Sequence, residues 1–200
     1  MKVRETNTET IGLSVVIPAY NESEAIQETL KTVVGTLESL PNEYEVIVVD
    51  DGSSDDTSVK IVEAGVRVIR HPINSGYGRS LITGIEHASY ENIVIVDADG
   101  TYPFADLPAL LEMYCEGFDM VVGARTGEHY RESLKKWVLR IIFRMLAEFT
   151  CGRTIPDINS GFRIINREKT LKFKRSYSSG FSFTTTITLL FMLNHLFVGY

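Results

Sequence analysis

The chain has 200 residues, of which 44% are hydrophobic and 23% are charged, and its formal net charge is −6. This length and apolar content allow one compact domain with its own core and exclude a largely disordered chain. Cys115 and Cys151 form no CxxC pair and have no histidine at metal-ligand spacing, which favours free thiols in a reducing compartment over a disulfide framework.

Acidic and basic side chains are distributed unevenly along the chain. Residues 1–124 carry 7 basic and 21 acidic side chains, whereas residues 125–200 carry 13 basic and 5 acidic ones. The acidic half could hold a metal ion, and the basic half could meet phosphate groups or an anionic bilayer surface. Two solvated faces would show the same counts, so charge alone leaves both interpretations open.

The apolar pattern predicts alternating strands and helices from residue 13 onward. Residues 13–17 form a buried strand closed by Pro18. The apolar positions from Ala25 to Leu40 recur at helical spacing, with Asn21 or Ser23 as the N-cap. Later segments predict strands at 46–49, 66–69, 93–96 and 120–122, and helices through 59–62, over 76–88 and over 104–114. This alternation favours an α/β fold with a mostly parallel central sheet and helices on both faces.

Unusual polar residues gather at the carboxyl ends of these predicted strands, where open α/β sheets bind ligands. The segments are Tyr20-Asn21-Glu22 after the first strand, Asp50-Asp51 after the second, Asp97-Ala98-Asp99 after the fourth and Gly123-Ala124-Arg125 after the fifth. We therefore expect the functional site at this edge of the sheet.

Asp97 and Asp99 place two negative charges close together directly after a buried strand. Like charges at such a separation require a cation or hydrogen-bond donors, and Mg²⁺ prefers carboxylate oxygens while it keeps waters and bridges to phosphates. Surface loops contain many DxD sequences by chance. The placement of this one after a buried run, together with the second acidic pair, favours a metal site.

The carboxylates of Asp50 and Asp51 permit two interpretations. Helix capping explains the later Asp55 and Asp56 adequately. Asp50 and Asp51 stand at the end of a strand, however, where a carboxylate can accept hydrogen bonds from a nucleobase or a ribose hydroxyl. Glu22 can likewise supply favourable charge to the first turn of a helix or contact a ligand.

Residues 131–149 combine basic and apolar side chains at helical spacing. Lys136, Arg140 and Arg144 fall along one side of the predicted helix, with apolar side chains over much of the rest. Such a helix can lie in a membrane interface with Trp137 near the headgroups, or it can pack on the core with a solvated basic face. Lys136 and Arg140 are candidates for binding a lipid phosphate.

Residues 181–200 contain no Asp, Glu, Lys or Arg, but three consecutive threonines and then Asn194 and His195 interrupt the apolar side chains. A buried helix running into a strand is favoured over a membrane span. Because the sequence stops in an apolar run at Tyr200, we expect the natural chain to continue, with any membrane anchor in that part. We expect residues 1–10 to form a flexible tail and residues 11–200 a single domain.

Together these segments resemble the family 2 glycosyltransferases with the GT-A fold, and most closely the dolichol-phosphate mannosyltransferase-like, polyprenyl-phosphate glycosyltransferase branch. The resemblance runs from about Leu13 to Tyr200 through VVIPAYNE, VIVVDDGSSDDT, NSGYGRS, VIVDADGTYP, VVGAR and DINSGFR. Each segment alone is ordinary, but their order at the expected strand ends is specific.

The resemblance implies a role for each matching position. The residues that would bind the nucleotide-sugar donor are Pro18, Ala19, Tyr20, Glu22, Asp50, Asp51, Asp97, Ala98 and Arg163. Asp51 would contact the base or ribose, and Asp97 would lie beside the ribose and the metal. Asp99 would bind the Mg²⁺ or Mn²⁺ ion that bridges the donor diphosphate. Arg125 and Arg163 would face phosphate groups, and Asp97, Asp99 and Arg125 would be the catalytic residues.

Two features depart from the pattern of the family, and one signature is absent. Many members have Gln two positions after the second Asp, where this chain has Thr101, which weakens the prediction of a side-chain metal ligand there. Members also commonly have a basic GxSK-like segment beyond the final strand, and this sequence ends before it. The QxxRW signature of processive polysaccharide synthases is absent, which favours addition of a single sugar.

The implied activity is inverting, metal-dependent transfer of one sugar from a GDP- or UDP-sugar to a polyprenyl phosphate such as dolichyl or undecaprenyl phosphate. The acceptor phosphate is largely ionised at pH 7, so it needs cations such as Arg125, Lys136 and Arg140 more than a general base. We expect a cytoplasmic protein that lies peripherally on the cytoplasmic face of a membrane and has no nucleic-acid partner.

Other interpretations remain open. A family 2 transferase that acts on a saccharide hydroxyl in cell-surface polysaccharide assembly would need a general-base carboxylate, for which Asp157 is a candidate. Thr101 would suit a catalytically inactive nucleotide-binding module. A nucleotidyltransferase is disfavoured, because the first strand-to-helix turn lacks a glycine-rich, basic phosphate loop.

Overall fold

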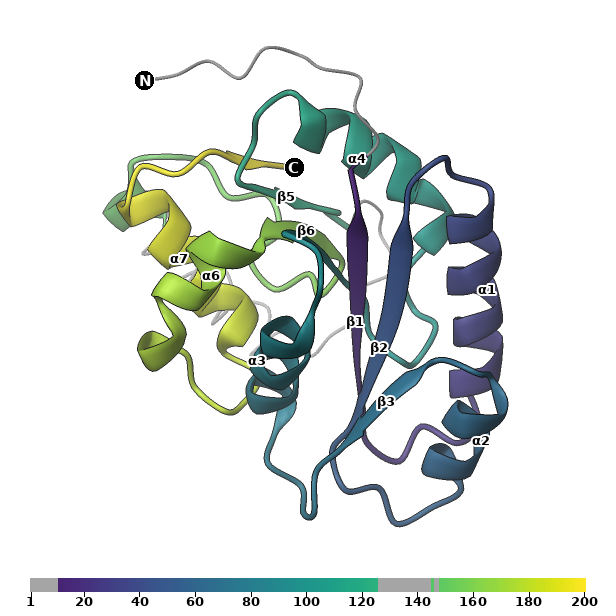
Figure 1. Ribbon diagram of the computed structural model, residues 1–200. Coiled ribbons are helices and arrows are strands. Elements are labelled where there is room, and N and C mark those ends of the chain that lie inside the picture. The colour runs from purple at the N-terminus through teal and green to yellow at the C-terminus, as the bar shows by residue number, and fades with distance from the viewer. Residues whose placement is uncertain (1–10, 126–144, 146–147) are drawn as a thin grey trace.

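The computed structural model describes residues 11–125, 145 and 148–200, and the elements below belong to this part of the chain. Its centre is a seven-stranded sheet with the strand order β3-β2-β1-β4-β6-β5-β7. Helices cover both faces of the sheet, as the sequence predicts (Figure 1).

Four parallel strands form the first part of the sheet, namely β1 (Leu13–Ala19), β2 (Tyr44–Asp50), β3 (Arg67–Arg70) and β4 (Asn92–Ile95). The crossovers between them contain α1 (Ile26–Glu38), α2 (Thr57–Glu63) and α3 (Tyr77–His87). Because these helices bury both faces of the sheet, the central strands consist of near-continuous Val and Ile runs.

The later elements complete the sheet and its second helical layer. A 3₁₀ helix (Phe104–Asp106) and α4 (Leu107–Cys115) lead into β5 (Met120–Val122). Further along come β6 (Arg163–Asn166), α6 (Arg167–Lys172), a second 3₁₀ helix (Lys174–Ser176), α7 (Phe183–Leu193) and β7 (Val198–Gly199). The buried helix running into a strand that was predicted within 181–200 is confirmed as α7 and β7. Within the described ranges, no helix has both the length and the apolarity needed to cross a bilayer.

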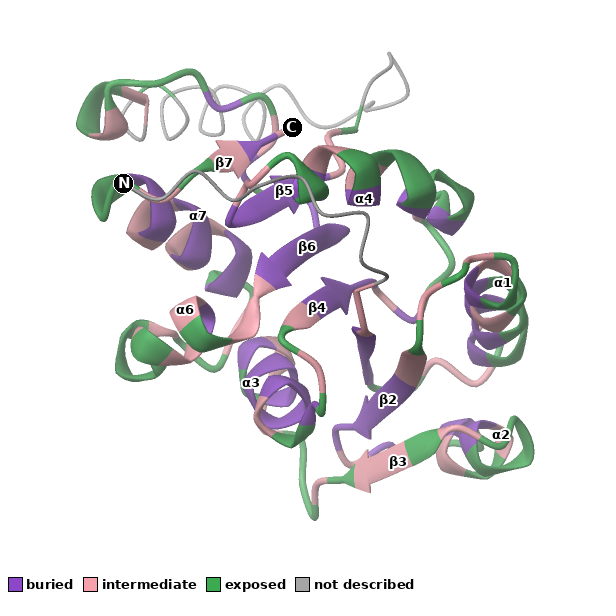
Figure 2. Cartoon of the chain, turned by 45° about the horizontal axis from the view of Figure 1, so that its top comes forward, coloured by how far each residue is buried: buried purple, intermediate pink, exposed green. Residues whose placement is uncertain are grey.

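The two faces of the sheet carry separate apolar cores. One core packs α1, α2 and α4 on the sheet through side chains such as Leu30, Ile61 and Leu111. The other packs α3 and α7 on the opposite face through side chains such as Leu81 and Phe183. Figure 2 shows the buried strands between these two layers. Full burial of each such side chain stabilises the fold by about 2 kcal/mol. These two cores therefore stabilise the sheet whose edge carries the site.

The sequence pattern did not predict β6, and this strand changes the order of the sheet. β6 lies between β4 and β5 and runs antiparallel to both. Two antiparallel steps restore the direction, so β5 is parallel to β4, and Gly123–Arg125 lie at the same edge as Asp97–Asp99. The N-terminal end of β6 lies at this edge as well, which brings the segment 157–162 to the site.

Two predictions at the start of the chain need correction. β1 continues past Pro18 to Ala19. The Ala19 carbonyl accepts a hydrogen bond from the Asp51 amide and therefore faces β2. Because backbone groups of successive strand residues face opposite sides, the Pro18 nitrogen faces β4, whose pairing with β1 ends at Val16. A missing N–H is tolerated there. The N-cap of α1 is Ala25, without a side-chain capping bond, rather than Asn21 or Ser23.

The predicted basic, amphipathic helix at 131–149 falls mostly outside the described residues. Met145 and residues 148–149 are helical, and the side chains of Met145 and Phe149 are exposed. Lys136 and Arg140 lie outside the described part of the chain, so their assignment stays a prediction.

Candidate functional site

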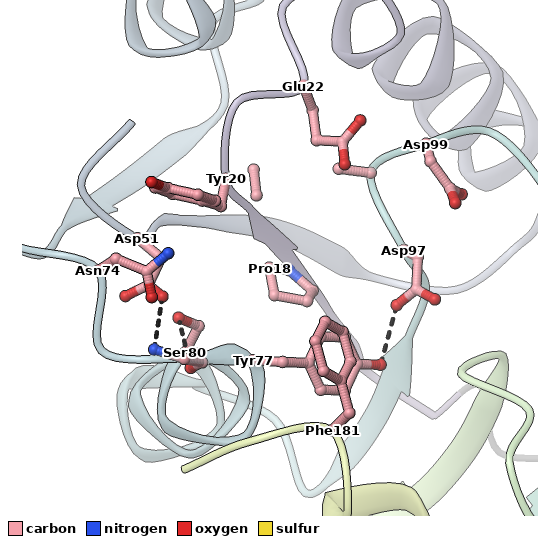
Figure 3. Close-up of a pocket in the computed structure, with 13 residues that line it drawn as sticks. Pro18, Tyr20, Glu22, Asp51, Asn74, Tyr77, Ser80, Asp97, Asp99 and Phe181 are labelled. Atoms are coloured by element: carbon pink, nitrogen blue, oxygen red, sulfur yellow. Dashed lines mark hydrogen bonds between the residues drawn. The ribbon is translucent and has the colours of Figure 1, made fainter. Parts of the chain in front are cut away.

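A cavity of about 410 Å³ lies at the carboxyl ends of β1, β2 and β4, beside the N-terminus of α3 (Figure 3). Its lining residues are Pro18, Ala19, Tyr20, Glu22, Asp51, Asn74, Gly76, Tyr77, Ser80, Asp97, Ala98, Asp99 and Phe181. Eight of these 13 lining residues are among the site residues proposed from the sequence, and the structure brings them together. Tyr20 and Asp51 lie on one side of the cavity, and Asp97 and Asp99 lie on the other.

Asp97 stands half-buried at the end of β4. The Tyr77 hydroxyl donates a hydrogen bond of 2.8 Å to Asp97 Oδ1. Burial raises the pKa of Asp97 above its ordinary value; the Tyr77 hydrogen bond opposes this shift, and the negative charge of Asp99 adds to it. The negative charge of Asp99 beside Asp97 would favour binding of a cation near the two carboxylates.

Asp99 is exposed at the rim of the cavity, and Thr101 orients it. The Thr101 amide and hydroxyl donate hydrogen bonds of 3.0 Å and 2.7 Å to Asp99 Oδ1. Thr101 thus supports the carboxylate from behind. Burial, followed by the charges of Asp99 and two further aspartates, also raises the pKa of Glu22 on the same wall.

The residues at this end of the cavity fit a divalent cation shared with a ligand. Among the residues that the structure describes, no cluster of three or more His, Cys, Asp or Glu side chains could hold a metal by itself. Mg²⁺ and related hard ions commonly take only one or two carboxylates and complete their shell with water and phosphate oxygens. Asp97 and Asp99 supply such a pair, and a cation would relieve the repulsion that raises their neighbours' pKa values.

Asp51 is buried on the opposite side of the cavity and accepts three hydrogen bonds. His71 Nδ1 lies 2.6 Å from its Oδ1, the Ser75 amide donates to Oδ1 at 2.9 Å, and the Gly76 amide donates to Oδ2 at 2.7 Å. Because an ionised carboxylate only accepts hydrogen bonds and has about four lone-pair positions, one position on Oδ2 is left for a ligand. His71 was not predicted from the sequence, because a lone histidine after an edge strand carries no motif.

Asp50 does not line the cavity. Its buried carboxylate accepts hydrogen bonds from the Ser53 amide at 2.9 Å and from the Ser58 hydroxyl, and Arg70 Nε lies 3.4 Å away. Asp50 therefore shapes the loop after β2, and the structure does not support its predicted contact with a base or ribose. Adjacent residues on a strand point to opposite sides, so only one member of the pair can face the ligand.

Asp55 joins the loop after β1 to the loop after β2. Its carboxylate accepts hydrogen bonds from the Thr57 hydroxyl, from the Thr57 amide at 3.0 Å and from the Ser23 amide at 3.1 Å. These bonds, the Thr57 hydroxyl first, lower the pKa of Asp55 from 3.8 to about 2. The loop that carries Tyr20 and Glu22 is thereby attached to the loop that carries Asp51.

We expect the free energy of unfolding of Asp55→Asn to fall less steeply at acid pH than that of the wild type. A carboxylate whose pKa is lower in the folded than in the unfolded state stabilises the fold above the unfolded pKa, and this contribution is lost as the pH falls through the folded pKa. The wild type should lose it between about pH 4 and about pH 2, given the lowered pKa of Asp55. Urea unfolding across this range checks the prediction. Asp56→Asn is the control, because Asp56 makes no side-chain capping bond. If the free energy of unfolding of Asp55→Asn changed with pH in parallel with that of the wild type, the prediction would be contradicted.

Arg163 does not face the cavity, which corrects its predicted contact with a donor phosphate. It is 0% exposed, and its guanidinium donates to the Ser160 carbonyl at 3.1 Å, the Thr184 carbonyl at 3.2 Å and the Thr188 hydroxyl at 3.2 Å. A side chain that is enclosed in this way cannot reach a ligand. Arg163 instead connects β6 to α7 beneath the site.

Arg125 does not line the cavity, although its charge is near enough to lower the pKa of Asp97, and it forms a bidentate ion pair with Asp157. Arg125 Nε is 2.7 Å from Asp157 Oδ2, and Arg125 Nη2 is 3.1 Å from Oδ1. Asp157 also accepts the amides of Asn159 at 3.0 Å and Ser160 at 3.1 Å. Burial raises the pKa of Asp157, but the hydrogen bonds and the charge of Arg125 outweigh it, so the pKa is lower than usual.

Five cavity residues were not identified from the sequence, namely Asn74, Gly76, Tyr77, Ser80 and Phe181. The first four belong to the turn and first residues of α3, and the last comes from the loop before α7. Gly76 has a φ of 94°, and a Cβ at Gly76 or Gly78 would meet the carbonyl oxygens of Ser179 or Ser178 at 2.5 Å or 2.3 Å. The glycine spacing was a signal of this close approach, whereas Phe181 carries no signal in the sequence.

Comparison with known proteins places the chain in a family. Residues 14–173 match the family described as Glycosyl transferase family 2. The chain is 32% identical over 164 residues to undecaprenyl-phosphate 4-deoxy-4-formamido-L-arabinose transferase of Klebsiella pneumoniae (strain 342), with 78% of this chain and 49% of that protein covered. The chain thus spans about half the length of this curated relative.

Solved structures share the fold. Glucosyl-3-phosphoglycerate synthase from Mycobacterium tuberculosis in complex with uridine-diphosphate matches with a TM-score of 0.72 at 23% identity, over 94% of this chain and 69% of that one. The same enzyme with Mn²⁺, uridine-diphosphate-glucose and glycerol 3-phosphate matches with a TM-score of 0.73 at 23% identity, again over 94% and 69%. At this identity the likeness concerns the fold alone. The sequence-based prediction of the GT-A fold and of a resemblance to polyprenyl-phosphate transferases is confirmed, and the chain belongs to glycosyl transferase family 2.

Proposed function

We propose that this protein transfers a single sugar, with inversion, from a UDP- or GDP-sugar to a polyprenyl phosphate at the cytoplasmic face of a membrane. The observation that carries the proposal is the cavity with an aromatic ring and a carboxylate on one side and paired carboxylates on the other. A nucleoside diphosphate has the complementary pattern, because it joins a flat base with N–H donors to two phosphates that require a cation.

The first side of the cavity supports recognition of a base. The Tyr20 ring is 45% exposed and offers a face for stacking, and Asp51 keeps one lone-pair position on Oδ2. A carboxylate in this place accepts an N–H, which uracil and guanine carry on their pairing edges. Pro18 and Ala19 supply the apolar floor between the two sides.

The second side supports binding of the donor diphosphate with a metal ion. Asp97 and Asp99 would hold Mg²⁺ or Mn²⁺, and the solved synthase was crystallised with Mn²⁺ and a uridine-diphosphate sugar. Such an ion, when bound, supplies positive charge that offsets the charge developing on the leaving nucleoside diphosphate. The protein's own contribution is orientation, through Thr101 on Asp99 and through the anchored loops on Glu22 and Asp51.

A phosphate acceptor is supported over a saccharide hydroxyl by the state of Asp157. A hydroxyl acceptor needs a general base whose pKa lies near the working pH. The pKa of Asp157 lies below its ordinary value, and its oxygens are occupied by Arg125 and two amides, so Asp157 is a poor base. A polyprenyl phosphate is already ionised and needs cations, which Arg125, Lys136 and Arg140 would supply. The name of the Klebsiella relative also points to a polyprenyl phosphate acceptor.

Transfer of radiolabel tests the proposal against a non-catalytic nucleotide-binding module. We expect the full-length protein, incubated with Mn²⁺, to move label from a UDP- or GDP-sugar into the organic phase when undecaprenyl or dolichyl phosphate is present. Undecaprenol without the phosphate is the control acceptor and should remain unlabelled. Nucleotide binding without any transfer across the panel of sugars would favour the inactive module, and transfer to a soluble saccharide would favour the hydroxyl acceptor.

A further inference from the structure

The carboxylate of Asp97 is held from two directions. Tyr77 donates a hydrogen bond of 2.8 Å to Oδ1, as Figure 3 shows. On the other side lies Gly161, where a Cβ would meet Asp97 Oδ2 at 2.7 Å and Cγ at 3.0 Å. The Gly161 amide in turn donates to the Tyr102 hydroxyl at 2.7 Å, which fixes the backbone at this point. The carboxylate can therefore adopt few orientations.

Tyr77 is itself fixed by a segment that is distant in the sequence. Its ring stacks on the Phe181 ring, with centroids 5.5 Å apart and planes inclined by 21°. The loop before Phe181 is attached to the start of α3, because the Gly78 amide donates to the Ser179 carbonyl at 2.8 Å. Gly76 and Gly78 permit this approach, since a Cβ at either position would collide with the loop backbone. The ring packing thus places the Tyr77 hydroxyl independently of the hydrogen bond that it makes.

We propose that Tyr77 is a positioning residue for Asp97, and that its hydroxyl holds this carboxylate in the orientation that binds a divalent cation together with a nucleoside diphosphate. The inference rests on the proposed function, since it concerns the same cavity. Tyr77 occupies one lone-pair position on Oδ1 and leaves the others for ligands. Partners of this kind behind a metal ligand typically contribute 10- to 100-fold to metal affinity, because they fix the ligand before the ion arrives.

Tyr77→Phe separates positioning from packing, because it removes the hydroxyl and keeps the ring that stacks on Phe181. The matched control is Tyr90→Phe, since the Tyr90 hydroxyl also faces a carboxylate, Glu43 at 3.5 Å, but lies away from the cavity. Calorimetry measures the affinity of each protein for UDP and for GDP, with Mn²⁺ and with EDTA. Thermal unfolding of both variants should stay close to that of the wild type.

We expect Tyr77→Phe to bind the metal-free nucleotide as the wild type does, within about twofold, and to lose about tenfold of the gain in affinity that Mn²⁺ provides. The electron paramagnetic resonance spectrum of bound Mn²⁺ should change in the same variant and not in Tyr90→Phe. Equal loss of affinity with Mn²⁺ and with EDTA would mean that the hydroxyl has a general structural role, which would overturn the inference. An unchanged Mn²⁺ gain would overturn it as well.

Asp99→Asn distinguishes this inference from the proposed function. If the wild type shows a Mn²⁺ gain that Asp99→Asn abolishes and Tyr77→Phe retains, only the role of Tyr77 is wrong. If the wild type shows no Mn²⁺ gain with either nucleotide, the metal-dependent donor site itself is wrong, and the positioning role fails with it.

Discussion

Asp99→Asn is expected to lower sugar transfer by about 10³-fold, which corresponds to roughly 4 kcal/mol of transition-state stabilisation. Asp99 is exposed, so the fold does not depend on its charge. The Thr101 amide and hydroxyl donate to Oδ1, and the asparagine carbonyl oxygen can accept both bonds. The substitution therefore keeps the shape of the rim and removes the negative charge that would hold a cation.

Initial rates of label transfer at saturating Mn²⁺ and donor measure this effect, and the melting temperature verifies the fold. Asp106→Asn is the matched control, because Asp106 is also an exposed aspartate and does not line the cavity. The control should retain the wild-type rate. If Asp99→Asn retained more than about a tenth of that rate, the electrostatic role of this carboxylate in catalysis would be disproved.

Arg163→Met is expected to lower the free energy of unfolding by about 3 kcal/mol. The variant leaves the Ser160 carbonyl without its buried donor, whereas the Thr184 carbonyl and the Thr188 hydroxyl each lose one bond but keep the 2.8 Å bond between them. The unsatisfied buried carbonyl costs about 1–3 kcal/mol, loss of the other hydrogen bonds from a charged donor adds to this cost, and removal of a buried charge offsets part of the sum. The change acts where β6 meets α7, so it should destabilise the whole sheet edge that carries the site.

Urea unfolding at pH 7 measures this loss, with Arg79→Met as the control because the Arg79 side chain is exposed. The control should unfold at the urea concentration of the wild type. The opposite pattern for Arg163→Met, with unchanged stability and weakened donor binding, would restore the phosphate contact that the sequence motif suggested. The two roles of this arginine thus give opposite experimental results.

Local patterns in the chain were sufficient to predict most of the fold. Buried strands such as 46–49 and 120–122 consist of consecutive Val, Ile or Met, and the segments between them repeat apolar residues at helical spacing. Such patterns depend only on neighbours along the chain. β6 was missed because its four residues begin with Arg163 and end with Asn166, and only its position between β4 and β5 makes it a strand.

The residues of the site likewise fall into those that local sequence patterns predict and those that depend on tertiary packing. Tyr20, Asp51, Asp97 and Asp99 could be predicted because each follows the end of a strand within four residues, and the ends of parallel strands lie at one edge of the sheet. Asp50 and Arg163 belong to the same motifs, but their side chains turn into the protein. Which way a residue faces depends on the packing around it, which a motif does not contain.

The sequence alone determined the family, the parallel α/β architecture and the edge at which the carboxylates meet, because these follow from local periodicity and the order of motifs. Only the tertiary structure decided that Tyr77 and Phe181 stand behind Asp97, that Asp157 is occupied by Arg125, and that Arg163 is enclosed. Each of these contacts joins segments far apart in the chain. Such contacts form only when the sheet and its helices bury their apolar faces against each other, so no local pattern records them.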